Sequence, residues 1–178
     1  EHFGVVADII ALAKGIASGL PLGAMIAPAK IMDWEAGSHA STFGGNPLSC
    51  QAAMATIELL EKNLMQNAAQ QGQRLLNGLL ELQKTYECMG DVRGKGLMAA
   101  VELVKDRETK KPATDWRSRI IKNTFEKGLL VLGCGENSIR FSPSLTVTAG
   151  EVDVCLSIFE EALKELAGKQ SSKLKAER

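Results

Sequence analysis

The chain lacks the features that mark secreted, membrane and metal-binding proteins. It has only four cysteines, Cys50, Cys88, Cys134 and Cys155. They are too scattered for a disulfide scaffold, and none of them form the short pairs of a zinc site. No apolar run approaches the about 20 residues that span a bilayer, and the first ten residues lack the basic segment of a signal peptide. These absences predict a cytoplasmic protein with reduced thiols and no metal centre.

The chain also lacks a net charge. Lys plus Arg and Asp plus Glu both total 21, so no overall field would draw the protein to nucleic acid or to an anionic membrane. With 178 residues, 45% of them apolar, the chain can bury one large core or two small ones. We therefore expect small-molecule partners bound at local sites, and neither nucleic acid nor membrane as a partner.

The pattern of apolar residues changes near Pro47. Residues 1–48 are rich in glycine and other small residues, with short apolar runs that suit buried strands between loops. From Pro47 onward, apolar residues recur every three or four positions, which predicts an amphipathic helix and then a second one from about Leu64 to Tyr86. The first part should be loop-rich, and the second should begin with helices.

The remaining residues alternate between strand and helix patterns. A glycine-punctuated turn at 90–96 precedes the strand GLMAAVELV, and a helix is expected over 116–127. Two strands, LLVLG and SIRFSPSL, are joined by the glycine-rich turn GCGEN, and a last helix begins near Thr148 with Glu151 as its capping-box partner. This order predicts a small α/β unit of three or four strands, antiparallel in part.

Lys14 is the residue best suited to covalent chemistry. It lies in DIIALAKGIASGLPLGA, and no other charged residue occurs between Asp8 and Lys30. An amine in apolar surroundings loses hydration in its charged form, so the neutral, nucleophilic form becomes more populated. The ordinary alternative for a lone lysine is a solvated surface charge. The pattern favours a lysine that reacts with a carbonyl group.

Four phrases in this order resemble one enzyme family: LAKGIASGLPLGA, STFGGNPLSCQAA, VRGKGLMAAVEL and IRFSPSL. The chain is similar to the class III (subgroup II) pyridoxal-phosphate-dependent aminotransferases of the 4-aminobutyrate, ornithine and acetylornithine type. The resemblance implies an α/β fragment of a fold-type I PLP-transferase. Residues 1–48 would be the C-terminal part of the large PLP-binding domain, and residues 49–178 the connecting helix and the small C-terminal α/β domain.

The resemblance also implies roles for three residues. Lys14 would bind pyridoxal 5'-phosphate covalently and then act as general base and acid. Thr42 would offer its hydroxyl to the cofactor phosphate, typically that of the neighbouring subunit in a homodimer with shared active sites. Arg140 would bind a substrate carboxylate through two parallel hydrogen bonds. Its alternative is a strand-edge arginine paired with a nearby glutamate, since Ile139 and Phe141 favour burial.

Arg93 and Lys95 in VRGKGL remain open candidates. They could be cationic neighbours of the site or belong to a solvated turn.

Family members are more than twice as long as this chain, which begins with Glu1 instead of methionine. The aromatic residue stacked on the cofactor, the aspartate that pairs with its ring nitrogen and the main phosphate loop would all lie upstream. We therefore expect the chain to be inactive alone and to belong to an active enzyme that uses an amino donor and a 2-oxo acid. Two alternatives stay open: a truncated, non-catalytic interaction module, and a PLP-dependent racemase or epimerase. The phrase EHFGVVADIIALAKGIASG slightly favours a 4-aminobutyrate-like donor.

Overall fold

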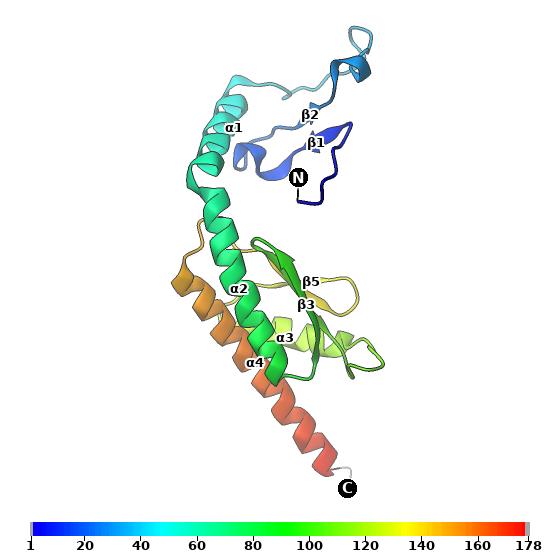
Figure 1. Cartoon of the computed structure of the whole chain (residues 1–178), viewed down its shortest axis with the longest axis vertical. Helices are drawn as coiled ribbons and strands as arrows, with labels where there is room; N and C mark the ends of the chain where they lie inside the picture. Colours follow the sequence, from blue (N-terminus) through cyan, green and yellow to red (C-terminus); the bar gives the residue numbers. More distant parts are fainter. Residues whose placement is uncertain (1, 177–178) are drawn as a thin grey trace. The chain divides into compact units, whose positions relative to one another are not determined.

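The computed structural model describes residues 2–176, with side chains described through Gly168. The chain divides into two compact units, Glu1–Asn63 and Leu64–Arg178 (Figure 1). The domain boundary predicted between residues 48 and 49 remains a prediction.

The first unit is a small hairpin with one helix. Strands β1 (Ile10–Leu12) and β2 (Ala24–Ile26) pair antiparallel, and the chain between them forms the 3-10 turn η1 (Lys14–Ala17). A second 3-10 turn, η2 (Ala29–Ile31), follows β2. The strands lie in the apolar runs where they were predicted, but the expectation that they are buried is wrong, because every residue of both strands is exposed. Two strands alone cannot bury a face.

Helix α1 (Pro47–Leu59) begins where the sequence predicted. Asn46 is its N-cap and accepts a hydrogen bond from the Ser49 amide at 2.9 Å, and Pro47 needs no partner because it lacks an amide hydrogen. One π-helical turn, Leu60–Leu64, leads into α2 (Met65–Thr85). Both predicted helices are therefore confirmed, and Leu75 and Leu79 form the buried side of α2.

The second unit contains a four-stranded antiparallel sheet in the order β3-β4-β6-β5. Its strands are β3 (Met89–Lys95), β4 (Met98–Leu103), β5 (Leu132–Cys134) and β6 (Ser138–Phe141). The predicted α/β unit and its hairpin between β5 and β6 are confirmed.

Strand β3 was predicted as a turn, and the structure corrects that prediction. Of its glycines, Gly90 and Gly94 lie within the strand and allow close packing. A Cβ atom added at Gly90 would lie 2.7 Å from the Val104 side chain, and one at Gly94 would lie 2.9 Å from the Met98 carbonyl oxygen. The turn itself is at Gly96, whose φ of +53° favours glycine.

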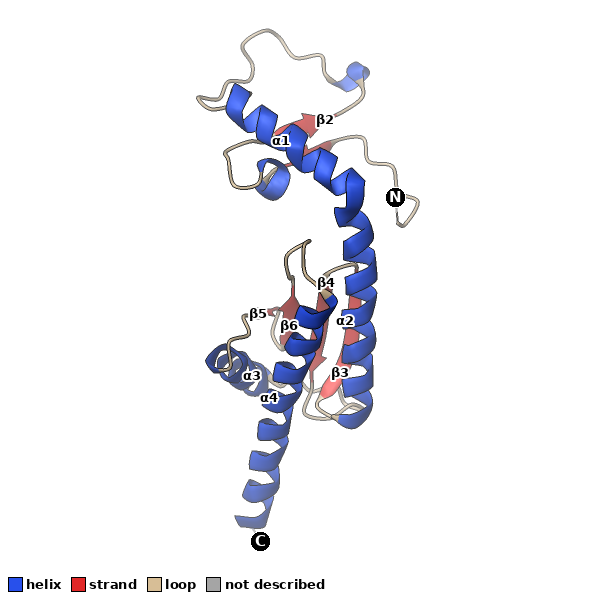
Figure 2. Ribbon diagram, turned by 90° about the vertical axis from the view of Figure 1, so that its left-hand side faces the viewer, coloured by secondary structure: helices blue, strands red, loops and turns tan. Residues whose placement is uncertain are grey.

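Three helices cover one face of this sheet. Helix α2 packs on β3 and β4, while α3 (Thr114–Glu126) packs on β4, β5 and β6. Helix α4 (Ala149–Ala176) runs beside α2 and also contacts α3 (Figure 2). The core between helices and sheet includes Phe159, whose ring meets that of Phe141 edge-on with centroids 5.1 Å apart. The second unit is thus a two-layer α/β structure. Over residues 2–176, no helix is both long and apolar enough to cross a membrane.

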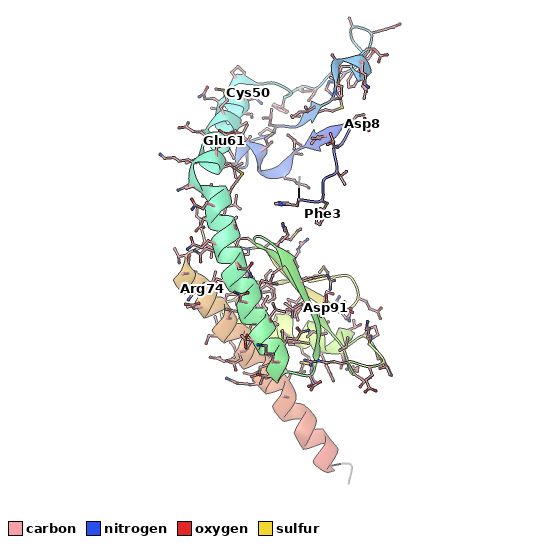
Figure 3. All side chains as sticks on the ribbon, in the orientation of Figure 1. Phe3, Asp8, Cys50, Glu61, Arg74 and Asp91 are labelled. Atoms are coloured by element: carbon pink, nitrogen blue, oxygen red, sulfur yellow. The ribbon has the colours of Figure 1, made fainter. Side chains whose placement is uncertain are left out.

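Polar contacts fix the start of α4 and join it to α2. The Thr148 amide donates to Glu151 at 2.8 Å and the Glu151 amide donates to the Thr148 hydroxyl at 3.3 Å, which confirms the predicted capping box. Arg74 of α2, labelled in Figure 3, binds Asp153 of α4 through two hydrogen bonds of 2.7 Å. These contacts set where α4 begins and tie it to its neighbouring helix.

The contact between α2 and the β3–β4 turn predicts a strong effect of Gly72→Ala. A Cβ atom at Gly72 would lie 2.2 Å from the Gly96 carbonyl carbon, which is backbone and cannot move aside easily. We expect Gly72→Ala to lower the free energy of unfolding by about 3 kcal/mol, since overpacking outweighs the better helix propensity of alanine. Chemical denaturation measures this. Gly150→Ala in α4 is the control, because no atom lies within 4 Å of its added Cβ. Equal stability of the two variants would contradict the packing.

The ionisation of Tyr86 at alkaline pH is simple to record by absorbance, because Tyr86 is the chain's only tyrosine. Burial and then its hydrogen bond to Glu160 raise the pKa of Tyr86 to about 12. Since the folded pKa lies above the ordinary value of about 10, the stabilisation is complete below that pH and is lost as the pH rises through the folded pKa. We expect tyrosinate absorbance to stay low at pH 11 while circular dichroism shows the folded state. Ionisation near pH 10 in the folded protein would contradict this environment.

Candidate functional site

Lys14 begins the turn η1 in an unusual backbone conformation. Its φ is +60°, in the left-handed region that residues other than glycine rarely adopt, and Ser18 at the end of the same turn has φ +49°. Such conformations cost roughly 1–3 kcal/mol each and persist only where the surrounding structure determines them. The side chain of Lys14 is exposed, and its amino group has no hydrogen bond or ion pair with the side chains described through Gly168 or with the described backbone. The fold therefore fixes the backbone of this lysine and leaves its amine free.

Helix α1 holds the segment that follows Lys14. Ala17 is buried, and the Ser18 hydroxyl lies 2.8 Å from the Thr56 hydroxyl on α1. Asn46, the N-cap of the same helix, donates from Nδ2 to the Pro21 carbonyl at 3.5 Å. Asn46 was not predicted from the sequence, although an asparagine directly before a proline is a typical N-cap signal. The stretch from Lys14 to Pro21 thus lies against α1.

Thr42 lies in the glycine loop that leads into the same helix. The loop residues 42–45 are exposed, and their four amides donate no hydrogen bond within the described chain. Gly45 has φ +70°, and a Cβ at Gly44 would lie 2.9 Å from the Ser41 Cβ, so both positions require glycine. A hydroxyl and several free amides before a helix N-terminus form a donor set suited to an anion.

Arg140 lies on the opposite side of its strand from the core. In β6 the side chains of Ile139 and Phe141 are buried and that of Arg140 is exposed. Its guanidinium has no ion pair or hydrogen bond with residues 2–168. The expectation of a buried or glutamate-paired arginine on an edge strand is therefore wrong: β6 lies between β4 and β5, and the alternation of the strand points Arg140 away from the helices. A free guanidinium in this place can bind a carboxylate.

The structure brings two of the three candidates to one element. The segments of Lys14 and Thr42 both join α1 in the first unit, whereas Arg140 belongs to the second unit. Whether Arg140 meets Lys14 stays a prediction.

The second unit also contains a cavity of about 450 Å³. Apolar side chains, including Leu75, Phe141 and Val152, form much of its wall, and hydroxyls and Glu151 lie at its polar side. Cys155 lines it too, and burial raises the pKa of this thiol to about 11. This cavity was not predicted from the sequence, because it is formed by the loop 142–148 over α2 and α4.

Comparison with known proteins decides the family. The sequence profile of the class-III aminotransferases matches residues 1–163, which is most of the chain. The chain belongs to the class-III aminotransferase family. It is 42% identical to a leucine/methionine racemase of Thermococcus litoralis over 93% of its own length. It is 40% identical to an acetylornithine aminotransferase of Caldanaerobacter subterraneus, also over 93% of its length.

A solved structure of the family has the same fold. An amine transaminase from an uncultivated Pseudomonas species, solved in its PLP-bound form, matches 92% of this chain with a TM-score of 0.84 and 38% sequence identity. The predicted family and fold class, a fragment of an α/β PLP-dependent transferase, are therefore confirmed. The chain spans only about 40% of the length of these proteins: 38% of the racemase and 40% of both the aminotransferase and the amine transaminase.

Proposed function

We propose that this chain is part of a longer, PLP-dependent aminotransferase that moves an amino group from an amino acid or an omega-amino acid to a 2-oxo acid. The proposal rests on the conformation and surroundings of Lys14. Its backbone is held in a strained turn against α1, and its amine is free of any partner in the described chain. Within this family, a lysine so placed is best explained by covalent binding of a carbonyl compound.

The residues present fit pyridoxal 5'-phosphate. Lys14 offers the amine that its aldehyde requires, and the Thr42 hydroxyl with the amides of residues 42–45 offers donors for its phosphate. When bound, the cofactor supplies an electron sink for the negative charge that develops at the substrate Cα. Nζ of Lys14 would take the Cα proton and return it after the electrons have shifted.

Arg140 would orient the substrate. Its planar guanidinium can donate one hydrogen bond to each oxygen of a carboxylate, and two parallel hydrogen bonds fix a direction as well as a position. A substrate held by its carboxylate has the reacting Cα–H bond in a defined place. For a 4-aminobutyrate-like donor, Arg140 would hold the single carboxylate, which lies at the end of the molecule opposite to the amine.

The longer enzyme would contain the residues that this chain does not supply. We assign residues 1–48 to the large PLP-binding domain and residues 49–178 to the connecting helix and the small domain. A cytoplasmic homodimer, in which Thr42 serves the neighbouring active site, would complete the arrangement. The 178 residues alone would be inactive.

Amino-acid racemisation is the second candidate, because a relative at 42% identity is a leucine/methionine racemase. Both reactions need the same lysine and differ in where the proton returns. To decide between them, the full-length enzyme is given an L-amino acid or 4-aminobutyrate, with and without 2-oxoglutarate. An aminotransferase forms glutamate only when the oxo acid is present. Formation of the D-amino acid without an oxo acid, seen by chiral chromatography, would instead establish the racemase.

A further inference from the structure

The charged side chains on the sheet face turned away from the helices, here called the open face, follow from the strand register. Arg93 of β3 and Arg140 of β6 both lie opposite Ala100 of β4, one on each side. Asp91 lies opposite Glu102 in the next row. Two arginines thus lie about 10 Å apart by strand spacing, with two carboxylates beside them. Asp91, labelled in Figure 3, marks this face on β3.

Glu102 is within reach of both arginines. Its direct partner on β6 is Ser138, so Arg140 is its diagonal neighbour. Diagonal residues in an antiparallel pair have Cα atoms about 7–8 Å apart, a distance that long side chains can bridge. A glutamate and an arginine so placed on a half-exposed surface would pair if nothing held either of them.

The structure shows Glu102 bound to residues other than Arg140. Arg93 Nη1 lies 3.3 Å from Oε2 of Glu102, and Asn137 donates from Nδ2 to Oε1 at 3.5 Å. Asn137 is firmly placed, since it is 8% exposed and also donates to the Leu103 carbonyl at 2.6 Å. Both carboxylate oxygens of Glu102 are therefore engaged.

Arg93 is itself held by a second carboxylate. It also pairs with Asp91, and the hydrogen bond to Asp91 comes first among the causes that raise the pKa of Arg93. Arg93 therefore stays charged and in place between the two acids. The Arg140 guanidinium, by contrast, has no hydrogen-bond or ion-pair partner among residues 2–168.

We propose that Arg93 is a positioning residue that keeps Glu102 away from Arg140, so that the Arg140 guanidinium stays open for a substrate carboxylate. This inference rests on the proposed function of Arg140. Without Arg93, Glu102 would turn to Arg140 and compete with the incoming carboxylate for the same guanidinium. Arg93 would then affect substrate binding without touching substrate.

The test uses full-length enzyme and the variants Arg93→Met, Glu102→Gln and the double variant. Calorimetry measures the dissociation constant of butyrate, a carboxylate without an amine, and kinetics measures KM and kcat for a carboxylate-bearing donor. We expect Arg93→Met to raise the dissociation constant and KM about fivefold, the size of an exposed ion pair, with kcat nearly unchanged. Glu102→Gln alone should leave both constants within about twofold.

The double variant decides the matter. If Glu102 is the competitor, Arg93→Met with Glu102→Gln restores butyrate binding to near the parent value. If Arg93 contacts substrate directly or serves only the fold, binding stays weak in the double variant and the inference is overturned. Arg93→Gln serves in the same design if Arg93→Met does not fold. An unchanged dissociation constant in Arg140→Met would instead show that the proposed function of Arg140 is wrong.

Discussion

Replacement of Lys14 by alanine is expected to reduce turnover about a thousandfold or more. The variant loses both the nucleophilic amine and the base that moves the Cα proton, and either loss alone is costly. The backbone should tolerate the change, because the Lys14 side chain is exposed and makes no hydrogen bond or ion pair within the described side chains, residues 2–168. Steady-state kinetics on the full-length enzyme, with circular dichroism to show that it folds, measures the effect.

Lys30→Ala is the matched control for this prediction. Lys30 lies in the turn η2 of the same unit, and it is the next lysine along the chain. Its removal should leave kcat and KM unchanged. Turnover by Lys14→Ala close to that of the parent enzyme would refute the assignment of the catalytic lysine.

Replacement of Arg140 by methionine is expected to lower kcat/KM about 10- to 100-fold for substrates that carry a carboxylate. A charged hydrogen-bonded pair contributes about 1.5–3 kcal/mol, and each 1.4 kcal/mol corresponds to a factor of ten. Methionine fits the exposed position, so stability should not change much. Arg140→Lys should recover only part of the loss, because lysine lacks the two-pronged geometry.

Two substrates, one with a carboxylate and one without, distinguish carboxylate binding by Arg140 from a general loss of activity. An amine without a carboxylate should react with Arg140→Met as with the parent enzyme, whereas a carboxylate-bearing donor should react much more slowly. Arg119→Met, on the exposed side of α3, controls for the loss of a positive charge. An equal loss for both substrates would rule out carboxylate recognition by Arg140.

Local signals in the sequence predicted the helices well. Pro47 at the start of α1 and the pair Thr148 and Glu151 at the start of α4 act through contacts within one turn, so they can be identified without the fold. The hairpin of β5 and β6 was equally local. Strand β3 was missed because Gly90 and Gly94 were interpreted as turn residues, whereas packing against Val104 and Ala99 requires them.

The roles of the site residues were predicted from the family resemblance. The structural surroundings of these residues were not predicted. The exposure of Arg140 follows from strand alternation once β6 is known to run between two other strands. The network of Arg93, Asp91 and Glu102 depends on cross-strand register, which is long-range and cannot be read from VRGKGLMAAVEL alone. The strained turn at Lys14 likewise depends on α1, which lies more than 30 residues further along the chain.

The role of Lys14 is tested by finding which lysine binds the cofactor. The full-length enzyme is loaded with pyridoxal phosphate, reduced with borohydride to make the attachment permanent, and digested with trypsin. Trypsin does not cut after a modified lysine, and the next basic residue after Lys14 is Lys30. We expect the peptide covering residues 15–30 to disappear and a labelled peptide running through Lys14 to Lys30 to replace it. A label on any other lysine, with the 15–30 peptide intact, would contradict it.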